Sequence, residues 1–207
     1  MDNITRRDSG MAYITDEAIM KQQAVSRRKM QAYNTADRSD FEGLSKMISE
    51  WFGKCGENVF VNPPFYCDYG FNIEVGKNFY ANFNCTILDV GKVTIGDNCL
   101  LAPNVAIYTA GHPLHPDSRN SLYEYGIPVT IGDNCWIGGN AVICPGVKIG
   151  NNVVIGAGSV VTGDIPDWSL AAGNPCRVIR KITEDDRKYY FKRREFDPEA
   201  WEAIQKQ

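Results

Sequence analysis

A branched aliphatic residue recurs at every sixth position over two stretches of this chain. These residues are Ile95, Leu101, Ile107, Ile131, Ile137, Ile143, Ile149, Ile155 and Val161. A helix would place apolar residues three and four apart, and a half-buried strand would alternate every second residue. A period of six is typical of a solenoid with one short strand and one turn per hexad. We therefore predict 18-residue coils of three strands, stacked into a three-sided parallel β-solenoid.

Two other positions of the hexad agree with this architecture. Glycine often follows the aliphatic residue, as in Ile95-Gly96 and Ile149-Gly150, which suits a tight corner where the backbone needs freedom at φ. The fifth position holds small or modest side chains, namely Cys99, Val105, Cys135, Ala141, Val147, Val153 and Ser159. Each hexad therefore offers one large and one small side chain to an interior.

Composition indicates one domain with additional terminal segments, and it argues against nucleic acid and membranes as partners. The chain has 207 residues and a net charge of −3, from 22 basic and 25 acidic side chains. Such a chain has no positive field to attract nucleic acid or an anionic membrane, so we expect neither partner. It also lacks a stretch of about 18 apolar residues and an apolar signal-peptide core, which predicts a cytoplasmic location.

Seven cysteines are present: Cys55, Cys67, Cys85, Cys99, Cys135, Cys144 and Cys176. The set is odd in number and shows no CxxC pair or metal-finger spacing. We expect free structural thiols in a reducing compartment.

The chain divides into three parts. Residues 1–54 are predicted to be a helical segment, with helix over 15–54, a capping box at Ser39 and Glu42, and an apolar stripe that covers the open end of the solenoid. Residues 55–182 form the solenoid domain, in which the hexad phase slips before Ile95. Residues 183–207 are predicted to be a helical tail, because acidic residues begin and basic residues end the stretch 183–196.

Residues 110–127 interrupt the register and must form a protruding loop. This loop carries both histidines of the chain, His112 and His115. A histidine is the natural candidate for a general base near neutral pH, although a pair of solvated loop histidines is the plainer interpretation. The zinc-dependent carbonic anhydrases of similar architecture use three histidines per site. With two histidines in the chain, we expect no catalytic metal.

Six segments carry a family resemblance. They are Cys67-Asp68-Tyr69-Gly70, residues 78–83, Leu88-Asp89-Val90, Gly111-His112-Pro113-Leu114, Trp136-Ile137-Gly138-Gly139 and residues 172–177. With these segments in order, the chain resembles the maltose and galactoside O-acetyltransferases of the hexapeptide-repeat acyltransferases, and the first and third segments look more like the maltose branch. The resemblance implies a mainly β fold, a left-handed parallel β-helix, and a homotrimer with active sites between subunits.

The same resemblance implies roles for individual residues. His112 matches the catalytic histidine, whereas His115 does not. Gly139 matches the position whose backbone N–H stabilises an oxyanion. Asn82 matches a residue that holds the acceptor hydroxyl, although for the residue taken in isolation a polar side chain satisfying a coil corner is the favoured interpretation. Asp16, Asp68 and Tyr80 match sugar-contacting positions.

Acetyl-CoA is the implied acetyl donor. Its pantetheine arm would run beside Trp136, Ala157 and Thr162, and Arg177 and Arg180 would meet its phosphates, because the planar guanidinium pairs with phosphate oxygens. The plainer interpretation of the two arginines is a solvated basic patch. The chain departs from the family at Gly163, where a lysine is usual, and this puts cofactor affinity in doubt.

These observations predict transfer of acetyl from acetyl-CoA to a hydroxyl of a small sugar such as maltose or glucose. An amino sugar, a lipo-oligosaccharide or an antibiotic hydroxyl is the alternative acceptor, because each would need the same histidine. A noncatalytic solenoid that serves as a scaffold is a third possibility, which predicts that acetyl-CoA neither binds nor turns over.

Overall fold

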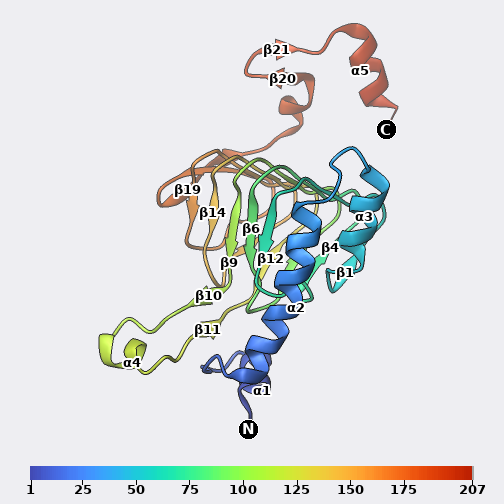
Figure 1. Ribbon diagram of the computed structural model, residues 1–207. Coiled ribbons are helices and arrows are strands. Elements are labelled where there is room, and N and C mark those ends of the chain that lie inside the picture. Colours follow the sequence, from blue (N-terminus) through green and yellow to red (C-terminus); the bar gives the residue numbers. More distant parts are fainter. Residues whose placement is uncertain (207) are drawn as a thin grey trace.

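The centre of the computed structural model, which describes residues 1–206, is a three-sided rod of short parallel strands (Figure 1). Side 1 contains β1 (Lys54–Cys55), β4 (Ile73–Val75), β7 (Val93–Ile95), β12 (Val129–Ile131) and β15 (Lys148–Ile149). Side 2 contains β2 (Phe60–Val61), β5 (Tyr80–Ala81), β8 (Leu100–Leu101), β13 (Trp136–Ile137), β16 (Val154–Ile155) and β18 (Ser169–Gly173), with β19 (Cys176–Lys181) as an antiparallel edge. Side 3 contains β3 (Phe65–Cys67), β6 (Cys85–Leu88), β9 (Ala106–Tyr108), β14 (Val142–Ile143) and β17 (Val160–Val161). The predicted parallel β-helix is therefore confirmed.

The interior of the rod holds the residues that the six-residue period predicts. The nine aliphatic residues from Ile95 to Val161 each expose 2% or less of their surface, and so do the fifth-position residues from Cys99 to Ser159. Burying an aliphatic side chain of this size stabilises a fold by about 1.5–3 kcal/mol. The seven cysteines are free thiols, and burial raises the pKa of Cys85 to about 11.

Successive coils differ in length. On side 2, paired residues are 20 positions apart from Tyr80 to Leu100, 18 apart from Trp136 to Val154, and 16 apart from Val154 to Leu170. The predicted coil length of 18 residues is right only for the coil that follows the loop. It is wrong for the earlier coil of 20 residues and for the later coil of 16 residues.

The two extra residues of each early coil lie at the corner that leads from side 3 to side 1. This corner, which we call the long corner, joins Cys67 to Ile73 in one coil and Leu88 to Val93 in the next. The protruding loop leaves the following coil at the same corner, between β9 and β12. The long corner explains why the hexad phase slips before Ile95.

The corner glycines do not serve the purpose that we predicted. Gly96 and Gly150 lie outside the left-handed region of φ, so the expected need for conformational freedom is wrong there. A Cβ on Gly96 would instead lie 2.1 Å from Oδ1 and 2.8 Å from the backbone N of Asp133 in the next coil. Glycine is required because the coils approach each other too closely for a side chain.

Asparagines occupy the left-handed positions instead. Asn78, Asn98, Asn134 and Asn152 have φ between 56° and 58°, a region that asparagine tolerates better than most residues. Their side chains form a ladder in which each amide donates to the next amide oxygen at 2.8–3.0 Å. The ladder satisfies polar groups that stack along one corner of the rod.

Three helices precede the rod: α1 (Asn3–Asp8), α2 (Glu17–Asn34) and α3 (Phe41–Ser49). The apolar stripe of α3 joins the rod's core, since Leu44 and Ile48 expose 1% or less, which confirms the predicted cover of the first coil. The capping box predicted at Ser39 is wrong. Asp40 is the N-cap, because its carboxylate accepts the N–H of Gly43 at 2.8 Å.

The protruding loop has its own local structure. β10 (Ala110–Gly111) and β11 (Tyr125–Gly126) pair antiparallel at its base, and α4 (Pro116–Asn120) lies at its tip. Figure 1 shows the loop extending away from the rod on the same side as α1. A β-bridge between Tyr13 and Glu124 joins the loop to the segment before α2.

The C-terminal tail lies beyond the last coil (Figure 1). It contains the 3₁₀-helix η1 (Glu184–Lys188), a hairpin of β20 (Tyr189–Phe191) and β21 (Arg194–Glu195), and α5 (Pro198–Gln205). The helix predicted over 183–196 is therefore wrong beyond its first turn, because three consecutive aromatic residues favour a strand. Residue 207 of the predicted tail lies outside the described residues.

Candidate active site

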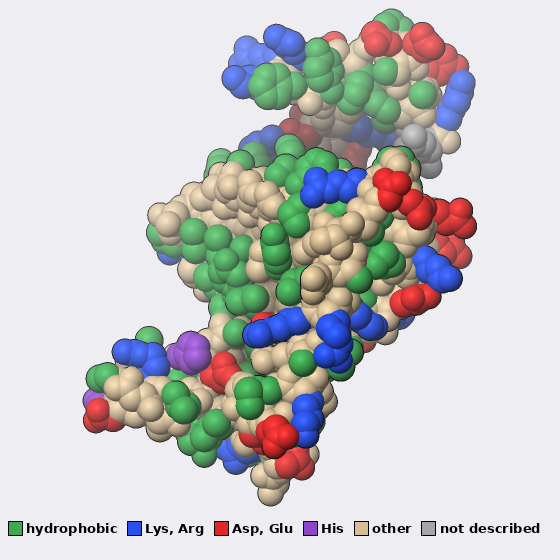
Figure 2. Space-filling view, in the orientation of Figure 1, with side chains coloured by type: hydrophobic (Ala, Val, Ile, Leu, Met, Phe, Trp, Pro, Cys, Tyr) green, Lys and Arg blue, Asp and Glu red, His purple; other side chains and the backbone are tan. Residues whose placement is uncertain are grey.

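His112 follows β10 and lies at an open pocket of about 360 Å³. The pocket is lined by Ile14, Thr15, His112, Arg119, Leu122 and Glu124. It therefore lies between the protruding loop and the segment before α2, and Figure 2 shows histidine side chains on the surface of the projecting loop. His115 has a different role, because its Nδ1 accepts the N–H of Asp117 and caps α4.

Glu124 is a pocket residue that our sequence reasoning missed. Its carboxylate accepts a hydrogen bond from the Thr15 hydroxyl. Its backbone is also fixed, since Glu124 and Tyr13 exchange two N–H···O bonds of 3.0 and 2.9 Å. The available signal was that Glu124 is one of two acidic residues in the loop 110–127, the other being Asp117. The structure thus brings a carboxylate and a histidine to one pocket.

The predicted sugar contacts Asp16 and Asp68 lie near this region but differ in environment. Asp16 is the N-cap of α2, and its two carboxylate oxygens accept from the Ile19 N–H at 3.1 Å and the Asn3 amide at 3.0 Å. Asp68 lies at the long corner, where burial, followed by the charges of Asp89 and Glu124, raises its pKa to about 6. Asp68 is therefore the carboxyl of this pair whose charge changes near neutral pH.

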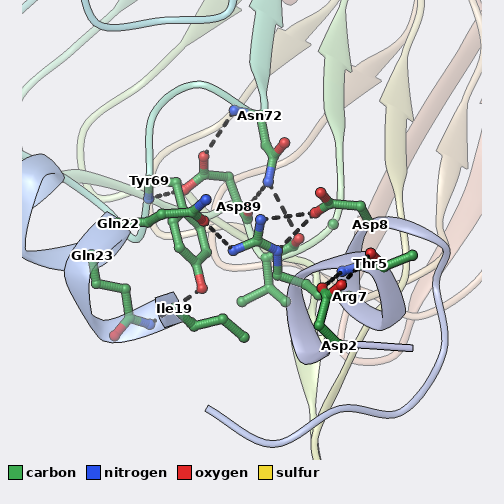
Figure 3. A network of polar contacts seen from close by, with 12 residues as sticks. Asp2, Thr5, Arg7, Asp8, Ile19, Gln22, Gln23, Tyr69, Asn72 and Asp89 are labelled. Atoms are coloured by element: carbon green, nitrogen blue, oxygen red, sulfur yellow. Dashed lines mark hydrogen bonds and ion pairs between the residues drawn. The ribbon is translucent and has the colours of Figure 1, made fainter. Parts of the chain in front are cut away.

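Asp89 shapes the long corner that holds Asp68. Its fully buried carboxylate accepts backbone N–H groups from residues 68, 69, 70 and 72 at 2.7–3.3 Å. Arg7 of α1 covers the same corner, with its guanidinium carbon 4.6 Å from the centre of the Tyr69 ring and an N–H donated to Gln22 at 2.9 Å (Figure 3). The helices and the long corner therefore form one packed unit beside the pocket.

Tyr80 lies on side 2, and Asn82 lies at the corner where side 2 meets side 3. Tyr80 is in β5, and its hydroxyl accepts a hydrogen bond from the Asn62 amide at 2.9 Å. The amide oxygen of Asn82 accepts the N–H of Phe83 at 2.8 Å. This bond fixes the Asn82 side chain, so its NH₂ is the group available to a ligand.

Side 2 carries a column of outward-facing apolar residues. Leu100, Trp136, Val154 and Leu170 are paired in successive strands, and Leu100 and Trp136 expose 46% and 53% of their surface. A contiguous exposed apolar surface can mark a binding site. The column suits an extended, flexible ligand that lies along the rod.

Gly139 and Ala157 lie at the corner beside this column. The N–H of Gly138 donates to the carbonyl of Ile155 at 2.8 Å, whereas the N–H of Gly139 has no acceptor within residues 1–206. Of the two glycines, Gly139 is therefore the one whose N–H could bind a developing negative charge.

The remaining predicted cofactor residues lie at the C-terminal end of the rod. Thr162 and Gly163 follow β17 and are exposed, and a Cβ on Gly163 would meet nothing within 4 Å. Arg177 is exposed and donates to the carbonyl of Cys176. Arg180 forms two bonds of 2.7 Å with the carboxylate of Asp186, so part of its charge is already compensated.

Several of the predicted site residues thus fall on two edges of side 3. Asn82, Gly139 and Ala157 lie at the corner between sides 2 and 3, whereas His112 and Thr162 belong to the long corner between sides 3 and 1. The pocket at His112 includes none of the first group. A single chain therefore presents two separate groups of predicted site residues, one at each edge of side 3.

Two further properties concern the described part of the chain. None of its helices is both long and apolar enough to cross a membrane. Among residues 1–206, no three histidine, cysteine, aspartate or glutamate side chains are grouped so that they could hold a metal ion.

Two family models match the chain. The one described as "Bacterial transferase hexapeptide (six repeats)" matches residues 128–163. The one described as "Maltose acetyltransferase hexapeptide capping motif" matches residues 6–56, which span the helices that cover the first coil.

Known proteins are similar over most of the chain. The galactoside O-acetyltransferase of Escherichia coli strain K12 is 51% identical over 176 residues, which are 85% of this chain and 87% of that protein. The crystal structure of a maltose O-acetyltransferase from Clostridium difficile 630 superposes with a TM-score of 0.87 at 49% identity, covering 89% of this chain and 99% of the other. A galactoside acetyltransferase in complex with coenzyme A gives a TM-score of 0.91 at 46% identity, covering 95% and 99%.

Proposed function

This chain belongs to the hexapeptide-repeat acetyltransferases that include the maltose and galactoside O-acetyltransferases, and we propose that it transfers acetyl from acetyl-CoA to a hydroxyl of a small sugar such as maltose or glucose. The observation that carries the acceptor side of the proposal is the pocket that His112 shares with Glu124 and Thr15. A pocket of about 360 Å³ is within the usual range for a small-molecule site.

His112 acts as the general base. A sugar hydroxyl is a poor nucleophile at neutral pH, so a base must remove its proton while its oxygen bonds to the acetyl carbon. His112 takes that proton and returns it to the sulfur that leaves when the C–S bond breaks. Glu124, which Thr15 holds in place, receives a second hydroxyl of the sugar or the other ring N–H of the histidine.

The backbone N–H of Gly139 receives the negative charge that develops on the carbonyl oxygen. A preorganised donor of this kind contributes about 100-fold or more to the rate. The transfer is direct, so the enzyme itself is never acetylated. Burial raises the pKa of Cys67 and Cys85, and Cys135, whose pKa the neighbouring Cys99 thiol lowers, is completely buried. These properties support direct transfer, because an accessible thiolate is the nucleophilic form.

The column on side 2 and the arginines beyond it fit acetyl-CoA as the donor, which supplies the activated thioester. Leu100 and Trp136 offer apolar surface to a pantetheine arm, and the small residues Gly139 and Ala157 lie beside it. Arg177 lies at the end of the column, where it would meet phosphates.

A homotrimer unites the two groups of predicted site residues. From the second coil onward, one row of outward residues on side 3 is small, with Thr86, Ala106, Val142 and Val160 in register, so this row suits close packing between chains. A threefold arrangement would place the Asn82 edge of one subunit beside the His112 edge of its neighbour. Both edges would then contribute to each active site.

The test is release of free CoA thiol from acetyl-CoA with maltose, glucose, a galactoside, glucosamine and a hydroxylated antibiotic as acceptors. We expect turnover with glucose or maltose, and a loss of at least about 100-fold in His112→Ala with CoA binding retained. Turnover that is unchanged in His112→Ala would contradict the assigned base. Turnover only with the antibiotic or the amino group of glucosamine would contradict the proposed acceptor.

A further inference from the structure

The hairpin of the C-terminal tail is a concentrated basic surface that the proposed mechanism does not use. Residues 187–194, which we call the basic hairpin, contain five cations and no acidic side chain, although the whole chain has a net charge of −3. The five cations are Arg187, Lys188, Lys192, Arg193 and Arg194. In Figure 2, lysine and arginine side chains gather at one edge of the tail, where Figure 1 places β20 and β21.

The basic hairpin is attached to the end of the apolar column on side 2. Arg180 pairs in register with Leu170, the last residue of that column. The Arg180 guanidinium forms two bonds of 2.7 Å with Asp186, and Asp186 also accepts the N–H of Thr183 at 2.9 Å. Since Arg187 and Lys188 follow Asp186 directly, these contacts fix the start of the hairpin beyond the column.

Internal contacts of the tail leave most of the cations exposed. Arg187 donates to the carbonyl of Ile204, and the N–H of Phe196 donates to the carbonyl of Lys188. Lys188, Lys192, Arg193 and Arg194 have exposed side chains. The hairpin therefore presents at least four cations whose charge is directed to solvent.

Two aromatic rings lie among these cations. Tyr190 and Phe191 expose 57% and 55% of their surface, and the Lys192 ammonium lies 5.2 Å from the centre of the Phe191 ring. Aromatic side chains of this kind stack on nucleobases, and neighbouring cations bind phosphates. Together they suit a ligand that combines a purine with several phosphate groups.

We infer that the basic hairpin binds the phosphate-bearing nucleotide end of CoA. This inference rests on the proposed function, in which the pantetheine arm of acetyl-CoA lies on side 2. It assigns a binding surface to the nucleotide at the other end of the same donor. Gly163 supplies no cation, and Arg180 is already paired with Asp186. The basic hairpin supplies the positive charge that Gly163 and Arg180 do not provide.

The experiment compares two donors in two triple variants. Acetyl-CoA carries phosphates, whereas acetyl-pantetheine carries none. The test variant is Lys188→Gln, Arg193→Gln, Arg194→Gln, in which each replaced side chain is exposed and Lys192 keeps its left-handed backbone. The control variant is Lys46→Gln, Lys54→Gln, Lys77→Gln, which removes three exposed cations near the first coils, far from β19 along the rod.

We expect kcat/KM for acetyl-CoA to fall about tenfold in the test variant, since each exposed charge contributes up to about fivefold. For acetyl-pantetheine, kcat/KM should stay within about twofold of wild type, and the control variant should match wild type with both donors. The difference for acetyl-CoA should also shrink in about 1 M salt.

Three results would overturn the inference: equal loss with both donors, no loss with acetyl-CoA, or an equal loss in the control variant. Unchanged CoA kinetics with reduced sedimentation on phosphatidylserine vesicles would assign the hairpin to a membrane surface instead. Failure of the proposed function has a different signature, because wild-type protein would then neither bind CoA in calorimetry nor turn over either donor.

Discussion

Asp89 accepts the backbone N–H of Gly70 at 2.7 Å, and this bond joins two successive coils at the long corner. The same carboxylate binds three further N–H groups of that corner and is completely buried. Burial raises the pKa of Asp89, and the hydrogen bonds from the N–H groups of Tyr69, Gly70 and Asn72 oppose that shift. One carboxylate therefore determines the path of the chain that carries Asp68.

Asp89→Asn should lower the free energy of unfolding by about 3 kcal/mol. An amide replaces one acceptor oxygen by a donor, so buried N–H groups would face an NH₂ and lose their partners. Urea unfolding measures the change, and Asp117→Asn in the exposed loop is the control. A loss no larger than in the control would mean that the corner is held by packing alone.

Gly96→Ala should destabilise the rod by about 1–3 kcal/mol, because the added Cβ would overlap Oδ1 and the backbone of Asp133. Gly163→Ala is the matched control, since it has no atom within 4 Å of its Cβ and an ordinary φ. Its stability should stay within about 0.5 kcal/mol of wild type. Equal thermal stability of the two variants would show that the coils can separate without cost.

Asp68→Asn should be more stable than wild type at pH 7 but not at pH 4. The pKa of Asp68 rises from 3.8 to about 6 on folding, so the folded state loses stability as pH increases from about 4 to about 6. The difference amounts to at most about 3 kcal/mol. Urea titrations at the two pH values measure it, and a variant effect that does not depend on pH would contradict the assignment.

Gly163→Lys should lower KM for acetyl-CoA about two- to fivefold at low salt and leave kcat unchanged. The site accepts a side chain without a clash, and the added cation lies at the C-terminal end of the rod. Gly163→Gln, which adds length without charge, serves as the control. A gain of equal size in both variants would assign the effect to packing.

Mixing two inactive variants should restore activity if each site uses two chains. Asn82→Ala and His112→Ala damage opposite edges of side 3, so a trimer refolded from equal amounts of both contains intact pairs of edges. Random assembly gives about a quarter of the wild-type sites. Thiol release measures the recovery, and none would be seen if Asn82 and His112 of one chain served the same site.

The fold was more predictable than its details. The six-residue period depends on side-chain size along one chain, and the residues that it identified between Ile95 and Val161 are all buried. Coil length depends on contacts between coils, such as those of Asp89, which a local pattern does not contain. The cap at Asp40 and the hairpin after Lys188 were missed because several local signals competed over a few residues.

The candidate site was also predictable only in part. His112 and Asn82 stand out through their motifs, and the structure places them on separate edges. Glu124 was missed because its partner Thr15 is 109 positions away in the sequence. The basic hairpin was predicted as part of a helix, so its cations were not seen as one surface.

The number of coils that follow the loop also sets the length of the apolar column on side 2. Three strand spacings separate Leu100 from Leu170 on side 2, a rise of about 14 Å. Loss of one such coil would shorten this span by about 5 Å and favour a donor with a shorter arm. Changes in the protruding loop would leave the span as it is. In the proposed mechanism, donor length thus depends on the number of coils and acceptor choice on a single insertion, so the two can evolve separately.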